Sequence, residues 1–271
     1  MRNKSLSFRS IVIPVILAAA TLLIAVCAGA QTATVLHSFG SNVKDATQPF
    51  SSVIFDKAGN LYGATNAGGL HGQGTVFELM PNAGGGWTEK VLHNFINNGI
   101  DGRGPWGNLI FDKNGNLYGT TMSGGSDDVG TVFELSPQKG GAWTETILHS
   151  FSNNGTDGQS ATTGVILDAK GNIYGTTEAG GTGTNCGGGA CGVVFELVHQ
   201  KSGSYTEKIL HDFSNNGTDG SNPSGLVFDA SGNLYGTTAN GGTAFYDCGV
   251  VFELSPVTGG CPCLFVLTMI N

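Results

Sequence analysis

The sequence predicts an all-β fold, a β-propeller built of four four-stranded antiparallel blades and closed by the N-terminal strand. Three observations support this prediction: one stretch returns four times, each copy contains short β runs, and the run missing from the last copy stands at the N-terminus. The returning stretch occupies residues 59–81, 115–137, 171–198 and 232–256. Its marker residues keep a nearly constant step and are expected to be structural: Tyr62, Tyr118, Tyr174, Tyr235, Phe77, Phe133, Phe195 and Phe252.

The first copy defines the four runs of each repeat. They cover residues 52–56, 60–65, 74–79 and 87–95. Each run is rich in β-branched and aromatic residues and is bounded by Gly, Asn or Pro, which indicates strands. An Asp-x-x-Gly-Asn turn joins runs one and two, because the Asp side chain can accept backbone N–H groups and the glycine tolerates a positive φ. Strict alternation in run four predicts that Glu89 and His93 share one face.

The link from run four to the next run one is longer and polar, as at residues 97–105, which suits a crossing between blades. The last copy contains runs one to three only, while residues 32–39 match run four. This predicts that the N-terminal strand completes the last blade and removes two exposed edges. The predicted domain spans 31–260, and a β-solenoid or an open repeat array is the alternative. Its repeats lie at about 40–95, 96–151, 152–213 and 214–256.

The first thirty residues predict a cleavable signal peptide. Arg2, Lys4 and Arg9 precede an uncharged apolar run, and a small-residue cleavage pattern ends at Ala30. A retained membrane anchor is the alternative, because the run approaches spanning length. Cleavage would remove three of the 12 basic residues and none of the 20 acidic ones, leaving a net charge of −11. Such a surface repels phosphate backbones, so we expect no nucleic acid partner. We also expect no membrane partner after cleavage of the signal peptide, and a monomer.

The motifs GNLYGTT, GTVFELSP, WTET and ILHSF resemble the GloVer tandem repeat of bacterial "choice-of-anchor" surface proteins. The resemblance covers nearly all of residues 32–256, four times over. It implies an exported, cell-surface-associated repeat protein of unknown biochemical role, secreted or held at the surface. Members of that family carry C-terminal anchors, whereas residues 261–271 form an atypical tail. This departure predicts either a freely secreted protein or a truncated chain.

One histidine recurs in each repeat. These residues are His37, His93, His149 and His211. In a propeller they should lie far apart on outer strands, whereas a zinc ion needs three or four converging ligands. A structural role is therefore expected, with no metal or other cofactor; Ca²⁺ at the Asn/Asp-rich links is the less favoured alternative, because turn chemistry explains those residues.

The recurring glutamates offer a second chemistry. They are Glu78, Glu134, Glu196 and Glu253 in run three, and Glu89, Glu145 and Glu207 in run four. Paired carboxylates could perform acid–base work on a glycan. Ordinary strand pairing is the alternative, and repetition in every copy favours it because an active site needs one asymmetric constellation. No catalytic residue is predicted.

Five cysteines follow the signal region, and an exported protein meets oxidising conditions. Cys186 and Cys191 flank one Gly-rich insertion and are the preferred disulfide, while Cys248 could pair with Cys261 or Cys263.

We expect a non-catalytic exported repeat protein in adhesion, envelope organisation or ligand display, with extracellular polysaccharide or envelope proteins as partners. The alternative is a propeller-type hydrolase or lyase acting on extracellular polysaccharide. Ligand would bind at the least repetitive loops, 180–191 and 241–248, or near a tryptophan found in one copy only. The candidate ligand-binding residues are Trp106, Asn185, Tyr246 and Asp247.

Overall fold

A computed structural model describes residues 32–42, 44–184, 186, 191–242, 248–256 and 265–270. Residues 37–271 form one compact unit that contains every strand; the unit before it, residues 1–36, is described only at 32–36, which form no strand. All regular structure in the described residues is β, which confirms the predicted fold class at that level. The described part of the chain contains no helix of sufficient length and apolarity to span a membrane. The predicted signal peptide, residues 1–30, lies outside the described residues.

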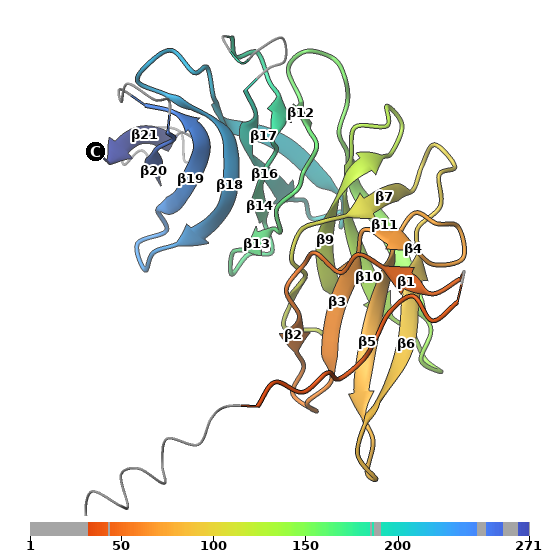
Figure 1. Cartoon of the computed structure of the whole chain (residues 1–271). Helices are drawn as coiled ribbons and strands as arrows, with labels where there is room; N and C mark the ends of the chain where they lie inside the picture. Colours follow the sequence, from red (N-terminus) through yellow and green to blue (C-terminus); the bar gives the residue numbers. More distant parts are fainter. Residues whose placement is uncertain are drawn as a thin grey trace, which may run out of the picture. The chain divides into compact units, whose positions relative to one another are not determined.

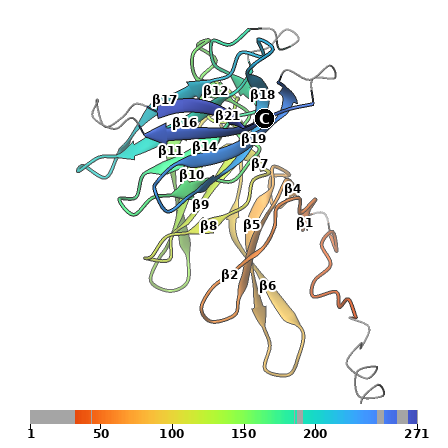
Figure 2. The same cartoon turned by 90° about the vertical axis from the view of Figure 1, so that its left-hand side faces the viewer.

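Each repeat forms one antiparallel sheet, as Figures 1 and 2 show. The first contains β2 (Ile54–Phe55), β3 (Leu61–Thr65), β5 (Thr75–Pro81) and β6 (Trp87–Asn94). The second contains β7 (Gly102–Pro105), β8 (Ile110–Phe111), β9 (Leu117–Gly124), β10 (Thr131–Pro137) and β11 (Trp143–Ser150). The third contains β13 (Ile166–Leu167), β14 (Ile173–Thr176), β16 (Val193–His199) and β17 (Tyr205–Asp212). The fourth contains β18 (Gly220–Phe228), β19 (Leu234–Gly241), β20 (Val251–Pro256) and β21 (Phe265–Ile270).

Two short ladders accompany these sheets, because the chain pairs briefly with itself at the Gly-Gly loops. They join β1 (Ala46–Thr47) to β4 (Ala67–Gly68), and β12 (Gly158–Gln159) to β15 (Ala179–Gly180). The predicted Asp-Gly turn is confirmed between β2 and β3. Asp56 Oδ1 accepts the backbone N–H groups of Ala58 (2.8 Å) and Asn60 (2.9 Å), and Gly59 has a φ of 89°. The same bonds recur at Asp112, Asp168 and Asp229.

The hydrophobic cores lie between successive sheets. One cluster joins Tyr62, Val76 and Phe95 of the first repeat to Leu117 and Phe133 of the second. The clusters between the second and third repeats and between the third and fourth are built the same way. In each, the phenylalanine after the recurring histidine meets the next sheet edge-on, and the Phe95 and Phe133 ring centroids are 5.2 Å apart. Burial therefore couples every repeat to its neighbour.

The predicted alternation of run four is wrong, because the ladder shifts register by one residue. Val76 pairs with His93, whereas Phe77 pairs with Val91, so Leu92 is an extra residue that turns inward and is buried. The same shift occurs in the second and third sheets. A one-residue bulge reverses the faces of the residues beyond it. Glu89 and His93 therefore face different neighbouring segments.

The predicted closure by the N-terminal strand is also wrong in the described residues. Residues 32–39 form no strand, and β20 pairs along its whole length with β21 instead. Phe39 packs against Phe77 of the first sheet, with ring centroids 5.0 Å apart. No strand pairing in the described part of the chain joins the first sheet to the fourth. The edge of β20 is therefore paired with residues 265–270 of the C-terminal tail and not with residues 32–39.

Candidate functional site

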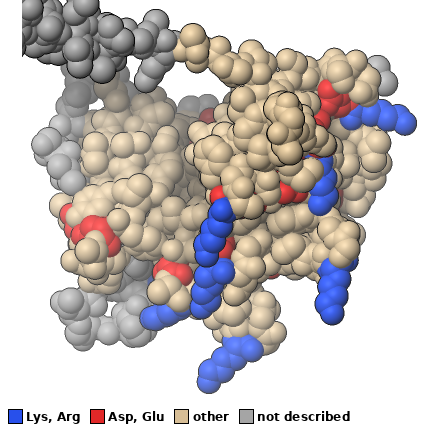
Figure 3. Space-filling view, turned by 90° about the horizontal axis from the view of Figure 1, so that it is seen from below, with Lys and Arg blue, Asp and Glu red and all other residues tan. Residues whose placement is uncertain are grey.

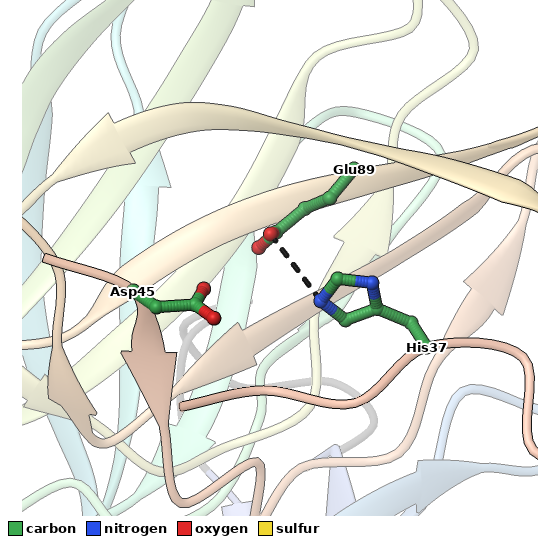
Figure 4. A group of neighbouring side chains, drawn as sticks. All are labelled: His37, Asp45 and Glu89. Carbon is green, nitrogen blue, oxygen red and sulfur yellow. Dashed lines mark ion pairs between the residues drawn. The ribbon is translucent and has the colours of Figure 1, made fainter. Parts of the chain in front are cut away.

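Recurring groups of one histidine, one aspartate and one glutamate lie where one repeat meets the next. We call these groups seams. They are His37, Asp45 and Glu89; His93, Asp101 and Glu145; and His149, Asp157 and Glu207. In each group one ligand-type atom from each residue lies within 4.8 Å of the others. Figure 4 shows the first seam, in which the His37 and Glu89 side chains face one another and the Asp45 carboxylate is directed toward both.

Each member of a seam comes from a different element. In the second seam, His93 stands near the end of β6, Asp101 immediately precedes β7, and Glu145 lies on β11. The His93 Nε2 atom is 3.2 Å from Asp101 Oδ2 and 3.5 Å from Glu145 Oε2. In the third seam, His149 Nε2 is 3.3 Å from Asp157 Oδ2 and 3.4 Å from Glu207 Oε1. The bulge makes this arrangement possible, because it turns the two side chains of one strand to different faces. On β6, Glu89 therefore belongs to the first seam and His93 to the second.

Burial, reinforced by a neighbouring carboxylate, perturbs the glutamates of the second and third seams. Burial raises the pKa of Glu145 to about 9, and the neighbouring Asp101 carboxylate adds to this effect. Burial also raises the pKa of Glu207 to about 7, with His149 opposing and Asp157 reinforcing the shift. Burial disfavours the charged form of His149, but the Asp157 hydrogen bond and the Glu207 charge outweigh it, so the pKa of His149 is raised. At neutral pH these groups therefore hold more protons than the same side chains would hold in water.

These shifts predict that the metal-free protein loses stability as pH rises from 5.5 to 8.5. Glu145 and Glu207 keep protons in the folded chain above the pH at which they ionise in the unfolded chain. The stability contributed by His149 is present below its unfolded pKa and is lost as pH rises through its folded value. All three contributions have the same sign, so folded protein binds more protons and stability falls with pH. With EDTA present, we expect the melting temperature to drop by several degrees, since about 1 kcal/mol corresponds to roughly 2–4 °C in a domain of this size.

The matched control for this pH effect is the Glu145→Gln, Glu207→Gln double variant. Removing both ionisable groups should flatten most of the slope measured by thermal melting between the two pH values. A melting temperature that rises with pH in the native sequence would contradict the assignment of retained protons to the seams.

A fourth histidine lacks the third member of the group. His211 Nε2 lies 3.2 Å from Asp219 Oδ2. In the first three sheets a glutamate pairs with a leucine of the neighbouring strand; these glutamates are Glu89, Glu145 and Glu207. In the fourth sheet, Leu267 pairs with the equivalent leucine, Leu254. This seam therefore has a histidine–aspartate pair without a glutamate.

The run-one segments of all four repeats line a single cavity of about 570 Å³. Ser52, Asn108, Thr163 and Gly225 come from the first, second, third and fourth repeats in turn. Hydrogen bonds join neighbouring segments: the Ser52 N–H donates to Asn108 Oδ1 at 2.7 Å, and the Thr120 hydroxyl donates to the Thr163 carbonyl at 2.7 Å. The repeats thus converge at this cavity.

Trp106, a predicted ligand-binding residue, lines this cavity and is 38% exposed. Its ring stacks on Phe50, which is 55% exposed, with centroids 4.6 Å apart and an interplanar angle of 29°. Phe50 occupies the same position in the first repeat, four residues before the run-one Ile-Phe pair, as Trp106 does in the second. Thr162 and Pro223 stand at the corresponding positions of the third and fourth repeats. The aromatic pair therefore breaks the symmetry of the repeats.

The other predicted site residues are placed as follows. Asn185, Tyr246 and Asp247 lie outside the described residues, as do Cys261 and Cys263. Cys186 and Cys191 form the expected disulfide, and Cys248 is exposed.

The run-three glutamates lie in strand pairs with tyrosine and asparagine. Glu78 Oε1 accepts the Tyr62 hydroxyl at 2.7 Å and the Asn60 amide at 3.1 Å, and Tyr174 donates to Glu196 in the same way. Burial, followed by the Glu78 hydrogen bond and charge, raises the pKa of Tyr62. These contacts match the strand-pairing alternative from the sequence, because each carboxylate serves its own sheet.

Two kinds of residue were missed from the sequence. The first is the aspartate of each seam, although it follows the histidine by eight residues in every repeat, at Asp45, Asp101, Asp157 and Asp219. The second is Phe50, whose equivalence to Trp106 becomes visible only when run one is aligned between repeats. Asp101 also takes part in turn chemistry as expected, since the Ile96 N–H donates to its Oδ2 at 3.0 Å.

Comparison with known proteins places the repeat motif in a family. The family described as Gloeobacter/Verrucomicrobia repeat matches residues 21–197 and 144–270, and the chain belongs to this family. This confirms the resemblance seen in the motifs, and the protein is a tandem-repeat protein. No curated protein matches the chain. Among solved structures, the Cellvibrio cellulosa alpha-L-arabinanase complexed with arabinohexaose is similar, with a TM-score of 0.39 and 14% identity; the match covers 79% of this chain and 75% of that one.

Proposed function

We propose that the protein is an exported, non-catalytic tandem-repeat protein of the cell surface or extracellular space that binds a neutral polysaccharide. In this proposal the four sheets are the blades of a four-bladed β-propeller around the central cavity, which receives the ligand. The observation that carries the proposal is the exposed Phe50–Trp106 stack at a cavity lined by all four repeats. Ligand sites are concave and combine apolar or aromatic surface with a few polar groups.

The break in repeat symmetry supports a binding role for this cavity. A residue that only supports the fold is expected to recur at the same position in each repeat, as Phe77 and its three equivalents do. Phe50 and Trp106 instead form an exposed stacked pair, whereas Thr162 and Pro223 occupy the corresponding positions of the third and fourth repeats. An exposed aromatic pair presents apolar ring faces with a polar indole N–H, which suits the apolar faces and hydroxyl groups of a sugar ring.

The charge of the chain supports a neutral ligand. The sequence carries 20 acidic and 12 basic residues. On the face seen in Figure 3, basic and acidic side chains are scattered, and most of the surface is neither. A chain with an excess of acidic residues favours neutral over anionic polymers. The basic and apolar N-terminal pattern and the Cys186–Cys191 disulfide support export to an oxidising compartment.

Replacing Trp106 with alanine is expected to weaken polysaccharide binding about 5- to 150-fold, because aromatic side chains that stack on a planar ligand ring, such as a nucleic-acid base, contribute roughly 1–3 kcal/mol each. Affinity electrophoresis in gels containing soluble glucan, mannan or arabinan measures this change. Phe50→Ala should weaken binding as well. Phe55→Ala is the matched control, since Phe55 is an exposed aromatic of the same repeat as Phe50 that neither lines the cavity nor stacks on Trp106.

Retardation that is the same for the native protein and Trp106→Ala would contradict the cavity as the binding site. Release of new reducing ends during the same incubation would instead favour a hydrolase or lyase.

A further inference from the structure

The second and third seams carry the donor set of a divalent transition-metal ion. Each offers one imidazole nitrogen and two carboxylates, and the three side chains come from three separate elements. Imidazole favours zinc and its first-row neighbours, whereas Ca²⁺ and Mg²⁺ favour shells made of oxygen alone. The composition of the seams therefore indicates a zinc-like ion.

The separations between these atoms match neighbouring ligands around one ion as well as long hydrogen bonds. The four histidine–carboxylate distances in the two seams lie between 3.2 and 3.5 Å. A charge-assisted N–H···O bond is shorter, at about 2.7–2.9 Å. Ligands at about 2.0–2.1 Å from a tetrahedral zinc ion lie about 3.3 Å from one another. The observed spacing would therefore let an ion enter without a large movement of the ligands.

Buried oxygen atoms in the seams lack hydrogen bonds. Asp101 is only 5% exposed, and its Oδ1 atom accepts no hydrogen bond. The Glu145 Oε1 and Glu207 Oε1 atoms are also buried without a hydrogen bond, although Glu207 Oε1 lies 3.4 Å from His149 Nε2. A buried carboxylate oxygen without a donor is costly unless a cation compensates it. The backbone N–H groups of Ile96 and Ser152 donate to the aspartates and fix their orientation, as supporting bonds do around metal ligands.

We propose that two zinc-class divalent ions bind the chain, one held by His93, Asp101 and Glu145 and the other by His149, Asp157 and Glu207. Each ion has three protein ligands, and water completes a tetrahedral shell. Because His93 belongs to the first sheet and Glu145 to the second, the first ion joins two successive repeats. The second ion joins the second and third sheets in the same manner.

The other two recurring histidines, His37 and His211, are excluded for specific reasons. In the first seam His37 lies within ion-pair distance of Glu89 but not of Asp45, so it has one close carboxylate where His93 and His149 each have two. The His211–Asp219 pair lacks the glutamate, because Leu267 occupies the corresponding register position. These partial seams therefore provide controls within the same chain.

Titration of the EDTA-treated protein with Zn²⁺ and Co²⁺ tests the proposal. The protein should carry no polyhistidine tag. Calorimetry is expected to give two Zn²⁺ per chain, and bound Co²⁺ is expected to give the strong visible absorption of a tetrahedral site. Added Zn²⁺ should raise the melting temperature, because an ion that binds only the folded chain stabilises it.

The Glu145→Gln, Glu207→Gln variant keeps side-chain size but removes one ligand from each site, and it should lose the Co²⁺ spectrum and most Zn²⁺ binding. Its melting temperature in EDTA verifies that it folds; should it fail to fold, His93→Gln alone should reduce the stoichiometry from two ions to one. His211→Gln should still bind two. Absence of any Co²⁺ spectrum in the native protein, or undiminished binding by the double variant, would overturn the proposal and assign any uptake to exposed histidines such as His71.

Discussion

Replacing Phe133 with alanine is expected to lower the free energy of unfolding by about 3–5 kcal/mol, the range for truncating a buried phenylalanine. Phe133 is 0% exposed, belongs to the core between the first two sheets and meets Phe95 edge-on. The change would leave a cavity at the contact that holds two repeats together. The expected fall in melting temperature is roughly 6–20 °C, measured by thermal or urea denaturation.

Phe55→Ala is the matched control for this substitution. Phe55 stands on β2 and is 67% exposed, so its truncation should change the free energy of unfolding by no more than about 0.5 kcal/mol. Equal effects of the two substitutions would contradict the placement of the core between sheets. A large effect of Phe55→Ala alone would indicate that Phe55 is covered in solution.

Gly119→Ala is expected to destabilise the protein by about 1–3 kcal/mol through overpacking. A Cβ atom at this position would lie 2.6 Å from Phe133 Cζ and 2.9 Å from Leu109 Cδ2. Phe133 and Leu109 are both buried, so neither side chain has space to move away. The same approach of glycine to a phenylalanine ring recurs at Gly63, Gly175 and Gly236.

Gly225→Ala separates this packing effect from the general effect of replacing a strand glycine. A Cβ atom at Gly225 would meet nothing within 4 Å, and the backbone there lies outside the left-handed region. We expect no measurable destabilisation in urea titrations of this control. If Gly119→Ala also caused no destabilisation, that result would contradict the close approach of Gly119 to the Phe133 ring.

Much of the fold could be predicted from the sequence because the same strand and turn patterns occur in four repeats. Strand content, the Asp-Gly turns and the order of strands within each sheet follow from local patterns. The partner of β20 does not, because β21 (Phe265–Ile270) lacks the Trp-Thr-Glu and His-x-Phe markers of run four. Backbone pairing along a sheet edge needs no such markers, so an unrelated apolar segment can take the place of the expected one.

The candidate site was predicted only in part. Trp106 was singled out because it occurs in one repeat only, and the histidines because they recur, although they were assigned a structural role. The carboxylate partners of the histidines were missed because Glu89 and His93 were assigned to one face of the strand. The bulge at Leu92 instead places Glu89 and His93 in different seams. The spacing of eight residues from each histidine to an aspartate was visible, but sequence alone does not show that the link folds back onto the histidine.

The central claim, that this repeat protein binds polysaccharide at its cavity without cleaving it, is tested most directly by co-sedimentation. Purified protein is mixed with insoluble neutral polysaccharides and with cell-envelope fractions, and released sugars are assayed in the same tubes. We predict saturable sedimentation with a polysaccharide, loss of that sedimentation in Trp106→Ala, and no released sugar. Sugar release, or a folded native protein that stays in the supernatant with every polysaccharide, would contradict the account.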